Sequence, residues 1–186
     1  NNTGQRIVKL VEENINFSNF LRKENFHNGI TTLMSFGGST NAIIHMMAMA
    51  GRTKNTINLG DFNEISEKTP VIINLKPAGS KLMEDLHYAG GVSAMLKNIE
   101  NLIYKDVETV SGKKLSEIIS NSNIYNDDVI RSQSNPINSK GSILILKGTL
   151  APNGAVIKVA AASKKFYEHV GKALVFDSAR ELSVEI

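Results

Sequence analysis

The sequence predicts an α/β protein in which a helix-rich part with a parallel strand precedes the beginning of an all-β, barrel-like domain. Apolar residues recur at helical spacing through much of the 186-residue chain before residue 120. A continuous apolar run, Val71–Leu75, has the length and composition of a buried parallel strand. Beyond residue 140, short β-prone segments alternate with glycines. The polar stretch Ser120–Lys140 separates the two patterns, so we predict one domain over residues 1–125 and a second over residues 126–186.

Two helices are predicted before the centre of the chain. Residues 5–14 place their apolar side chains on one side, as an amphipathic helix does. Ser18 is a good N-cap for a second helix, which we expect to run from Asn19 to about Ile30.

The Gly37–Asn41 turn and the apolar run behind it form the centre of the chain. Ser39 and Thr40 are good N-caps and Gly51 is a natural stop, so a helix is predicted between them. Its residues are apolar on every face, which is typical of a buried helix. A helix that begins in such a turn presents backbone N–H groups and two hydroxyls, which suit a carboxylate or a phosphate. A tight turn with an ordinary cap is the alternative interpretation.

Short helices surround the predicted strand. Asp61 is expected to cap a helix that Pro70 ends. After the strand, the pattern predicts helices over residues 81–88, about 92–103 and about 115–119.

The end of the chain has a β pattern. Three segments are expected to be strands of a barrel or sandwich that is incomplete in this chain: residues 142–147, 155–160 and 173–176. Asp177 then caps a last helix.

Composition excludes several classes of protein. No apolar run approaches the roughly 20 residues that a membrane span needs. The net charge of +3 comes from scattered basic residues, whereas nucleic-acid readers concentrate theirs, so neither a membrane nor a nucleic acid is an expected partner. The chain has no cysteine, which excludes disulfides, a thiolate nucleophile and the usual iron–sulfur ligands from its own residues. We expect a cytoplasmic protein.

Few side chains have a pattern that indicates chemistry. His45, one turn into the apolar helix, is interpreted as a core histidine, with a ligand contact as the alternative. The Glu84–His87 stretch has the residue types of half a metal site, but no second cluster complements it, so a structural role is preferred. Lys158 can pair with an anionic substrate, although an exposed strand lysine is the simpler interpretation.

Several motifs in order resemble those of the dihydroxy-acid and sugar-acid dehydratase family, which includes dihydroxy-acid dehydratase, phosphogluconate dehydratase and the aldonate dehydratases. The motifs are the Gly37–Asn41 turn with His45, and the stretches at residues 83–91, 128–131 with 135–136, 150–158 and 173–177. The resemblance covers nearly the whole chain.

The resemblance implies a hydro-lyase that converts a 2,3-dihydroxy carboxylic acid to a 2-keto acid. It favours dihydroxy-acid dehydratase of branched-chain amino-acid biosynthesis. Two alternatives stay open, namely a sugar-acid (aldonate or phosphogluconate) dehydratase and a non-catalytic remnant that acts as a binding module.

The resemblance also implies an iron–sulfur cluster and Mg²⁺ in the full-length enzyme, a small hydroxy acid as substrate, and a homodimer. The family binds its cluster through cysteines, so we expect this chain to be the middle piece of a longer enzyme and to bind neither cofactor alone. No catalytic residue or metal ligand is expected within it. Residues 1–125 correspond to the C-terminal part of the cluster-binding domain. The residues expected near the substrate or cluster are Gly38, Ser39, Thr40 and Asn41.

Overall fold

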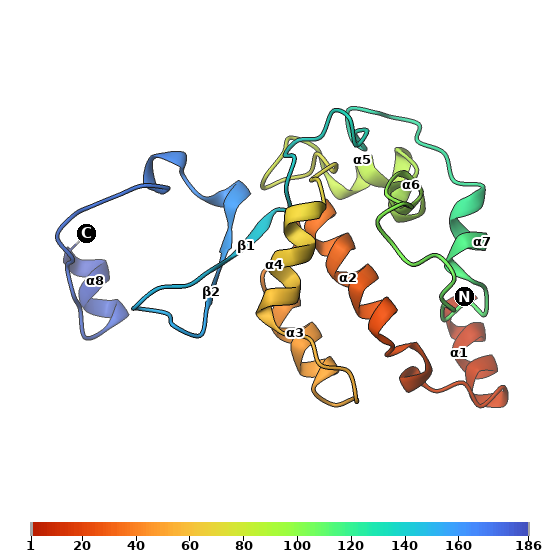
Figure 1. Ribbon diagram of the computed structural model, residues 1–186. Coiled ribbons are helices and arrows are strands. Elements are labelled where there is room, and N and C mark those ends of the chain that lie inside the picture. Colours follow the sequence, from red (N-terminus) through yellow and green to blue (C-terminus); the bar gives the residue numbers. More distant parts are fainter. Residues whose placement is uncertain (1, 186) are drawn as a thin grey trace.

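The computed structural model describes residues 2–185 and is rich in helices (Figure 1). The helices of the first part are α1 (Asn2–Glu12), the 3₁₀ helix η1 (Phe17–Phe20), α2 (Lys23–Phe36), α3 (Asn41–Ala50), α4 (Leu59–Lys68), α5 (Met83–Tyr88), α6 (Gly91–Asn98) and α7 (Leu115–Ser120). The remaining elements are β1 (Ile143–Leu146), β2 (Ala155–Lys158), η2 (Val159–Ala161), η3 (Lys164–Phe166) and α8 (Ala179–Glu185). None of the helices in residues 2–185 is both long and apolar enough to cross a membrane.

One apolar core lies where α2 packs against α3 and α4, which stand side by side in Figure 1. Strand β1 covers α4 and contributes to the same core. Its buried members are Ile30, Leu33, Met34, Ile43, Phe62 and Ile143. Burial of these side chains stabilises the arrangement, at about 1.5–3 kcal/mol for each large aliphatic or aromatic residue.

A second apolar core joins α5, α6 and α7 to the segment at residues 71–75. Its buried members are Ile72, Ile73, Leu75, Leu86, Ala89, Ala94, Met95, Ile99, Ile103, Ile119, Val129 and Ile130. The helical spacing predicted in this region therefore does produce buried helix faces, although α6 ends at Asn98 and not near residue 103.

The Val71–Leu75 segment is buried, as predicted, but its pairing across the fold is antiparallel. Val71 forms a bridge with Asn138, and Ile73 forms one with Ile130. The single parallel bridge of this segment, between Leu75 and Lys81, closes a local turn. The prediction of a parallel strand was wrong because burial on both faces does not depend on strand direction, and the partner is the returning stretch within residues 130–138.

Local signals gave the approximate places of several helices but not their ends. The helix predicted from Asn19 instead begins at Lys23, after η1, and Ser18 is not its cap. For α4, the cap is Asn58, whose side chain accepts the N–H of Gly60 at 2.8 Å. Asp61 accepts the N–H of Asn58 at 2.7 Å in return, so it completes the cap from inside the helix.

The sheet of the described residues has two antiparallel strands, β1 and β2, with Ile143 opposite Lys158 and Leu146 opposite Ala155. The segment at residues 173–176, predicted as a third strand, is irregular. Leu174 and Val175 are 79% and 87% exposed, because the described part of the chain offers this segment no strand to pair with. In Figure 1 the chain beyond β2 runs away from helices α1 to α7 in an open loop that ends in α8.

Helix α3 has the predicted bounds but is not buried within this chain. Only Ile43 and Ala50 are buried, and Ile44 is 67% exposed. Among the described elements, α2 is the main helix that packs on it, and one neighbour covers only one face. The prediction of burial on every face was therefore wrong for these residues.

Candidate functional site

The turn between α2 and α3 is built by a helix cap. Gly37 ends α2 in the left-handed conformation, with φ of 72°, which glycine adopts without steric cost. The N–H of Gly38 donates to the carbonyl of Leu33 at 3.1 Å, which is the long-range bond of a Schellman cap. A Cβ on Gly38 would collide with the end of the Leu33 side chain. The two glycines thus reverse the chain tightly and place Ser39 and Thr40 next to the end of α2.

The two hydroxyls of the turn have different roles. The Ser39 Oγ accepts the N–H of Asn41 at 3.2 Å and so caps the start of α3. The Thr40 side chain makes no capping hydrogen bond. Its hydroxyl is therefore available to a ligand without cost to the helix.

The turn forms one wall of a cavity of about 370 Å³. The lining residues are Phe36, Gly37, Gly38, Ser39, Thr40, Leu75, Lys76, Pro77, Met83 and Lys158. Three of the four residues predicted near the substrate or cluster, Gly38, Ser39 and Thr40, lie on this wall. Asn41 does not line the cavity.

Two lysines make this cavity positive. Lys76 follows the buried segment at residues 71–75, and the partly buried Lys158 ends β2. No carboxylate is among the lining residues that the structure describes. Two ammonium groups beside the N-terminus of a ten-residue helix favour an anion. Lys158 was considered in the sequence. Lys76 was not predicted as a site residue. The one feature of the sequence that could have indicated it is its position directly after an apolar run.

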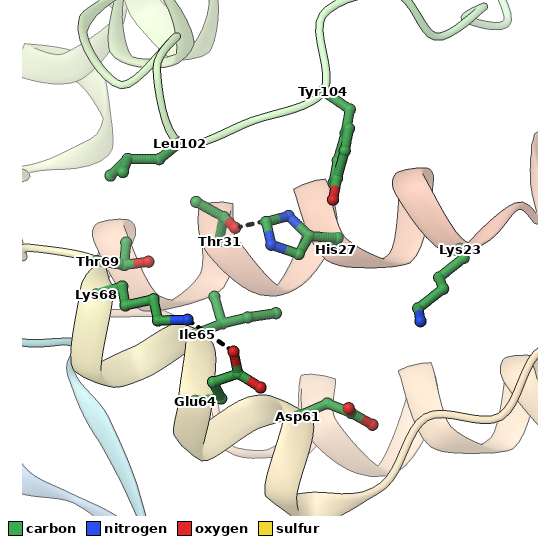
Figure 2. Close-up of a pocket in the computed structure, with 10 residues that line it drawn as sticks. All are labelled: Lys23, His27, Thr31, Asp61, Glu64, Ile65, Lys68, Thr69, Leu102 and Tyr104. Carbon is green, nitrogen blue, oxygen red and sulfur yellow. Dashed lines mark hydrogen bonds and ion pairs between the residues drawn. The ribbon is translucent and has the colours of Figure 1, made fainter.

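A second cavity, of about 390 Å³, lies between α2, α4 and the loop at residues 102–104 (Figure 2). Figure 2 shows His27 and Thr31 of α2 facing Glu64 and Lys68 of α4. The Thr31 Oγ1 lies 3.4 Å from Nδ1 of His27, and the Tyr104 ring meets the imidazole edge-on with centroids 5.0 Å apart.

The charges around this second cavity are mixed. Burial lowers the pKa of His27, although the nearby Glu64 carboxylate acts in the opposite direction. Glu64 and Lys68 form an ion pair at 2.6 Å, and the hydrogen bond from Lys68 lowers the pKa of the Glu64 carboxyl. With cations and anions both on its walls, this cavity has no preference for an anion, and we take the cavity at the Gly37–Thr40 turn as the candidate site.

The other residues considered for chemistry lie outside both cavities. His45 is exposed on α3, so its interpretation as a core histidine was wrong. Asp85 accepts the N–H of Leu82 at 2.7 Å at the start of α5, and the His87 ring meets that of Tyr88 edge-on. These contacts give the Glu84–His87 stretch a structural role at a helix end.

The chain's own residues do not fit an iron–sulfur cluster or a catalytic metal ion. The sequence has no cysteine to supply a thiolate. Within residues 2–185, no group of three or more His, Asp or Glu side chains could hold a metal ion. No step of the chemistry is therefore derived through either group from these residues.

Comparison with known proteins identifies the family. The family model for the dihydroxy-acid/6-phosphogluconate dehydratase N-terminal region matches residues 1–118, and that for the C-terminal region matches residues 128–186. Dihydroxy-acid dehydratase of Clostridium novyi (strain NT) is 47% identical over 94% of this chain and 32% of its own length. The dihydroxy-acid dehydratase of Pyrococcus furiosus is 44% identical over 99% of the chain and 34% of its own length. L-arabinonate dehydratase of Rhizobium leguminosarum bv. trifolii is 39% identical over 99% of the chain and 32% of its own length. The chain therefore spans about a third of the length of the curated relatives that it matches, and it belongs to the dihydroxy-acid/6-phosphogluconate dehydratase family.

Proposed function

We propose that this chain is the anion-binding segment of a hydro-lyase that removes water from a 2,3-dihydroxy carboxylic acid and yields a 2-keto acid. Family membership supports the reaction class, and the relatives named dihydroxy-acid dehydratase, at 44% and 47% identity, favour a branched-chain dihydroxy acid as substrate. The observation that carries the role of this segment is the cavity in which the Gly37–Thr40 turn meets Lys76 and Lys158.

In this proposal the substrate carboxylate lies in that cavity. The two ammonium groups neutralise it, and the Thr40 hydroxyl donates a hydrogen bond to one of its oxygens. Loss of the proton from carbon 2 moves negative charge toward the carboxylate as the enol forms. Positive groups that are already in place stabilise this charge without reorganisation. The segment thus binds and orients the acid.

The cofactors and the remaining architecture belong to the longer protein in this proposal. An iron–sulfur cluster and Mg²⁺ would be held by residues outside this chain, where they would supply Lewis-acid chemistry. We propose that residues 1–125 end an α/β domain and that residues 126–186 begin a barrel-like domain to which β1 and β2 belong. The two family models, which meet between residues 118 and 128, support this division. A cytoplasmic homodimer completes the proposal.

A sugar-acid dehydratase is the second candidate. The 39% identity with a relative named L-arabinonate dehydratase supports it, because that relative matches as much of the chain as the others do. The substrates of both enzyme classes carry a carboxylate, which would bind in the same cavity. The two classes would differ in the protein groups that contact the rest of the substrate.

The test compares the two substrate classes on the longer protein that contains these residues, loaded with its cofactors. The 2-keto acid product is measured with 2,4-dinitrophenylhydrazine, starting from 2,3-dihydroxy-3-methylbutanoate or from L-arabinonate. We expect kcat/KM to be higher for the branched acid by about tenfold or more, as a pocket matched to apolar groups gives. A higher kcat/KM for L-arabinonate would favour the second candidate. No keto acid from either acid or from 6-phosphogluconate would refute the reaction class and favour a binding module without catalysis.

A further inference from the structure

An apolar groove lies against the C-terminal half of α3, where Met46 and Met49 line it. The helix sequence is apolar around nearly its whole circumference, yet Met49, which lines the groove, is 38% exposed. Phe17 of η1, which is 62% exposed, extends the apolar surface. Large apolar side chains gathered in this way mark a surface that another structure covers.

The groove is a cavity of about 280 Å³ between η1, α2 and α3. Its lining residues are Phe17, Phe20, Leu21, Asn25, Phe26, Gly29, Met46 and Met49, and we refer to it as the α3 groove. Asn25 is the single polar side chain in this set, and no charged group lines the groove among the described residues. Three phenylalanines, a leucine and two flexible methionine thioethers suit an aliphatic or aromatic occupant.

The apolar sequence of α3 and the exposure of its side chains together indicate where the occupant of the groove comes from. A helix that is apolar all round is typical of the interior of a larger fold, with neighbours on several sides. In this chain α2 covers one face of α3, and the curated relatives are about three times as long as the chain. The additional residues of such relatives can pack against the faces of α3 that α2 leaves uncovered. A second copy would cover one face only and would leave the rest of the circumference exposed.

We propose that the α3 groove is covered by an apolar segment of the same polypeptide that lies outside residues 1–186. The chemistry of the occupant follows from the walls: aliphatic or aromatic side chains without a charge, which would be costly to bury there unpaired. This proposal is independent of the substrate and of catalysis, and it concerns a face of α3 other than the turn that lines the candidate site.

Photo-crosslinking in the longer protein tests the proposal without any assay of activity. The photoreactive residue p-benzoylphenylalanine replaces Phe17 in one variant and Met49 in another, because both side chains line the groove. If one variant fails to fold, the other still tests the proposal. Lys54, exposed in the connection after α3, is replaced in the same way as the matched control. Products are separated by mass and their peptides identified by mass spectrometry.

We expect the variants at residues 17 and 49 to crosslink to a peptide outside residues 1–186 while keeping the mass of one polypeptide. The control at residue 54 should give little of that product. A product of twice the polypeptide mass would identify a second copy as the occupant and overturn the proposal. Crosslinks confined to residues 1–186, equal yields at residue 54, or a natural polypeptide no longer than these 186 residues would overturn it as well.

Discussion

Replacement of Thr40 by valine distinguishes two roles of the Gly37–Asn41 turn, namely binding a ligand and only capping a helix. Valine keeps the branched shape at Cβ and replaces the hydroxyl with a methyl group. The Thr40 side chain makes no capping hydrogen bond, whereas Ser39 Oγ accepts the N–H of Asn41 at 3.2 Å. Loss of the Thr40 hydroxyl should therefore leave the free energy of unfolding nearly unchanged, and Ser39→Ala should cost about 0.5–1 kcal/mol, the lower part of the range for a lost cap.

The kinetic effect expected of Thr40→Val is much larger. A hydrogen bond to a charged group contributes about 1.5–3 kcal/mol, which corresponds to a loss of roughly tenfold to hundredfold in kcat/KM if the bond is made to the carboxylate in the transition state. Thr40→Ser, which keeps the hydroxyl, should retain most of the activity.

The assay measures kcat/KM and melting temperature of the longer protein at full cofactor occupancy. The expected result is a nearly native melting temperature for Thr40→Val together with the kinetic loss, and partial rescue by Thr40→Ser. A Thr40→Val variant with native kcat/KM, alongside a Ser39→Ala variant that loses only stability, would show that the turn is a cap and would refute its functional role.

Three further results are expected. A Cβ at Gly141 would lie 3.0 Å from Cα of Ser66 and 3.1 Å from Cβ of Met34, so Gly141→Ala should lower stability by about 1–3 kcal/mol in urea unfolding; an unchanged midpoint would contradict the packing of this segment on α4. Burial lowers the pKa of His27 below its ordinary 6.5, so the unfolded chain binds more protons there and this histidine makes stability fall as the pH drops below about 6.5. His27→Gln should flatten the slope of stability between about pH 7.5 and 5.5, and an unaltered slope would contradict this. The 186-residue chain alone should bind no stoichiometric iron–sulfur cluster after anaerobic reconstitution because it has no thiolate, and iron with sulfide at one cluster per chain would refute that.

Features set by neighbouring residues could be predicted from the sequence. The α2–α3 turn and the bounds of α3 followed from two glycines, two hydroxyl residues and Gly51, because caps depend on local backbone chemistry. The start of α2 was missed because Ser18 offers a cap that the chain does not use, and η1 forms there in its place. Its continuation to Phe36 was missed because residues 31–36 include two threonines and a serine, which have low helix propensity, although Gly37 marks the end of the helix.

Features set by distant pairing could not be predicted. The Val71–Leu75 segment gave no sign that its partners would come from a polar stretch, where the N–H of Arg131 donates to Ile72 at 2.8 Å and that of Ile137 donates to Val71 at 2.8 Å. The candidate site has the same origin. Lys76 and Lys158 reach one cavity only after β1 has packed on α4 and β2 has paired with β1.

The effect of Lys158→Met on kcat/KM shows whether one anion-binding cavity combines the Gly37–Thr40 turn with Lys158. Methionine keeps the length of the side chain and removes the charge. Lys172, exposed in the open loop before α8, supplies the matched control Lys172→Met. At full cofactor occupancy, Lys158→Met should lower kcat/KM roughly tenfold to hundredfold, as loss of a bond between charged groups does, while Lys172→Met should change it little. Equal, near-native values of kcat/KM for the two variants would refute the anion-binding role of this cavity.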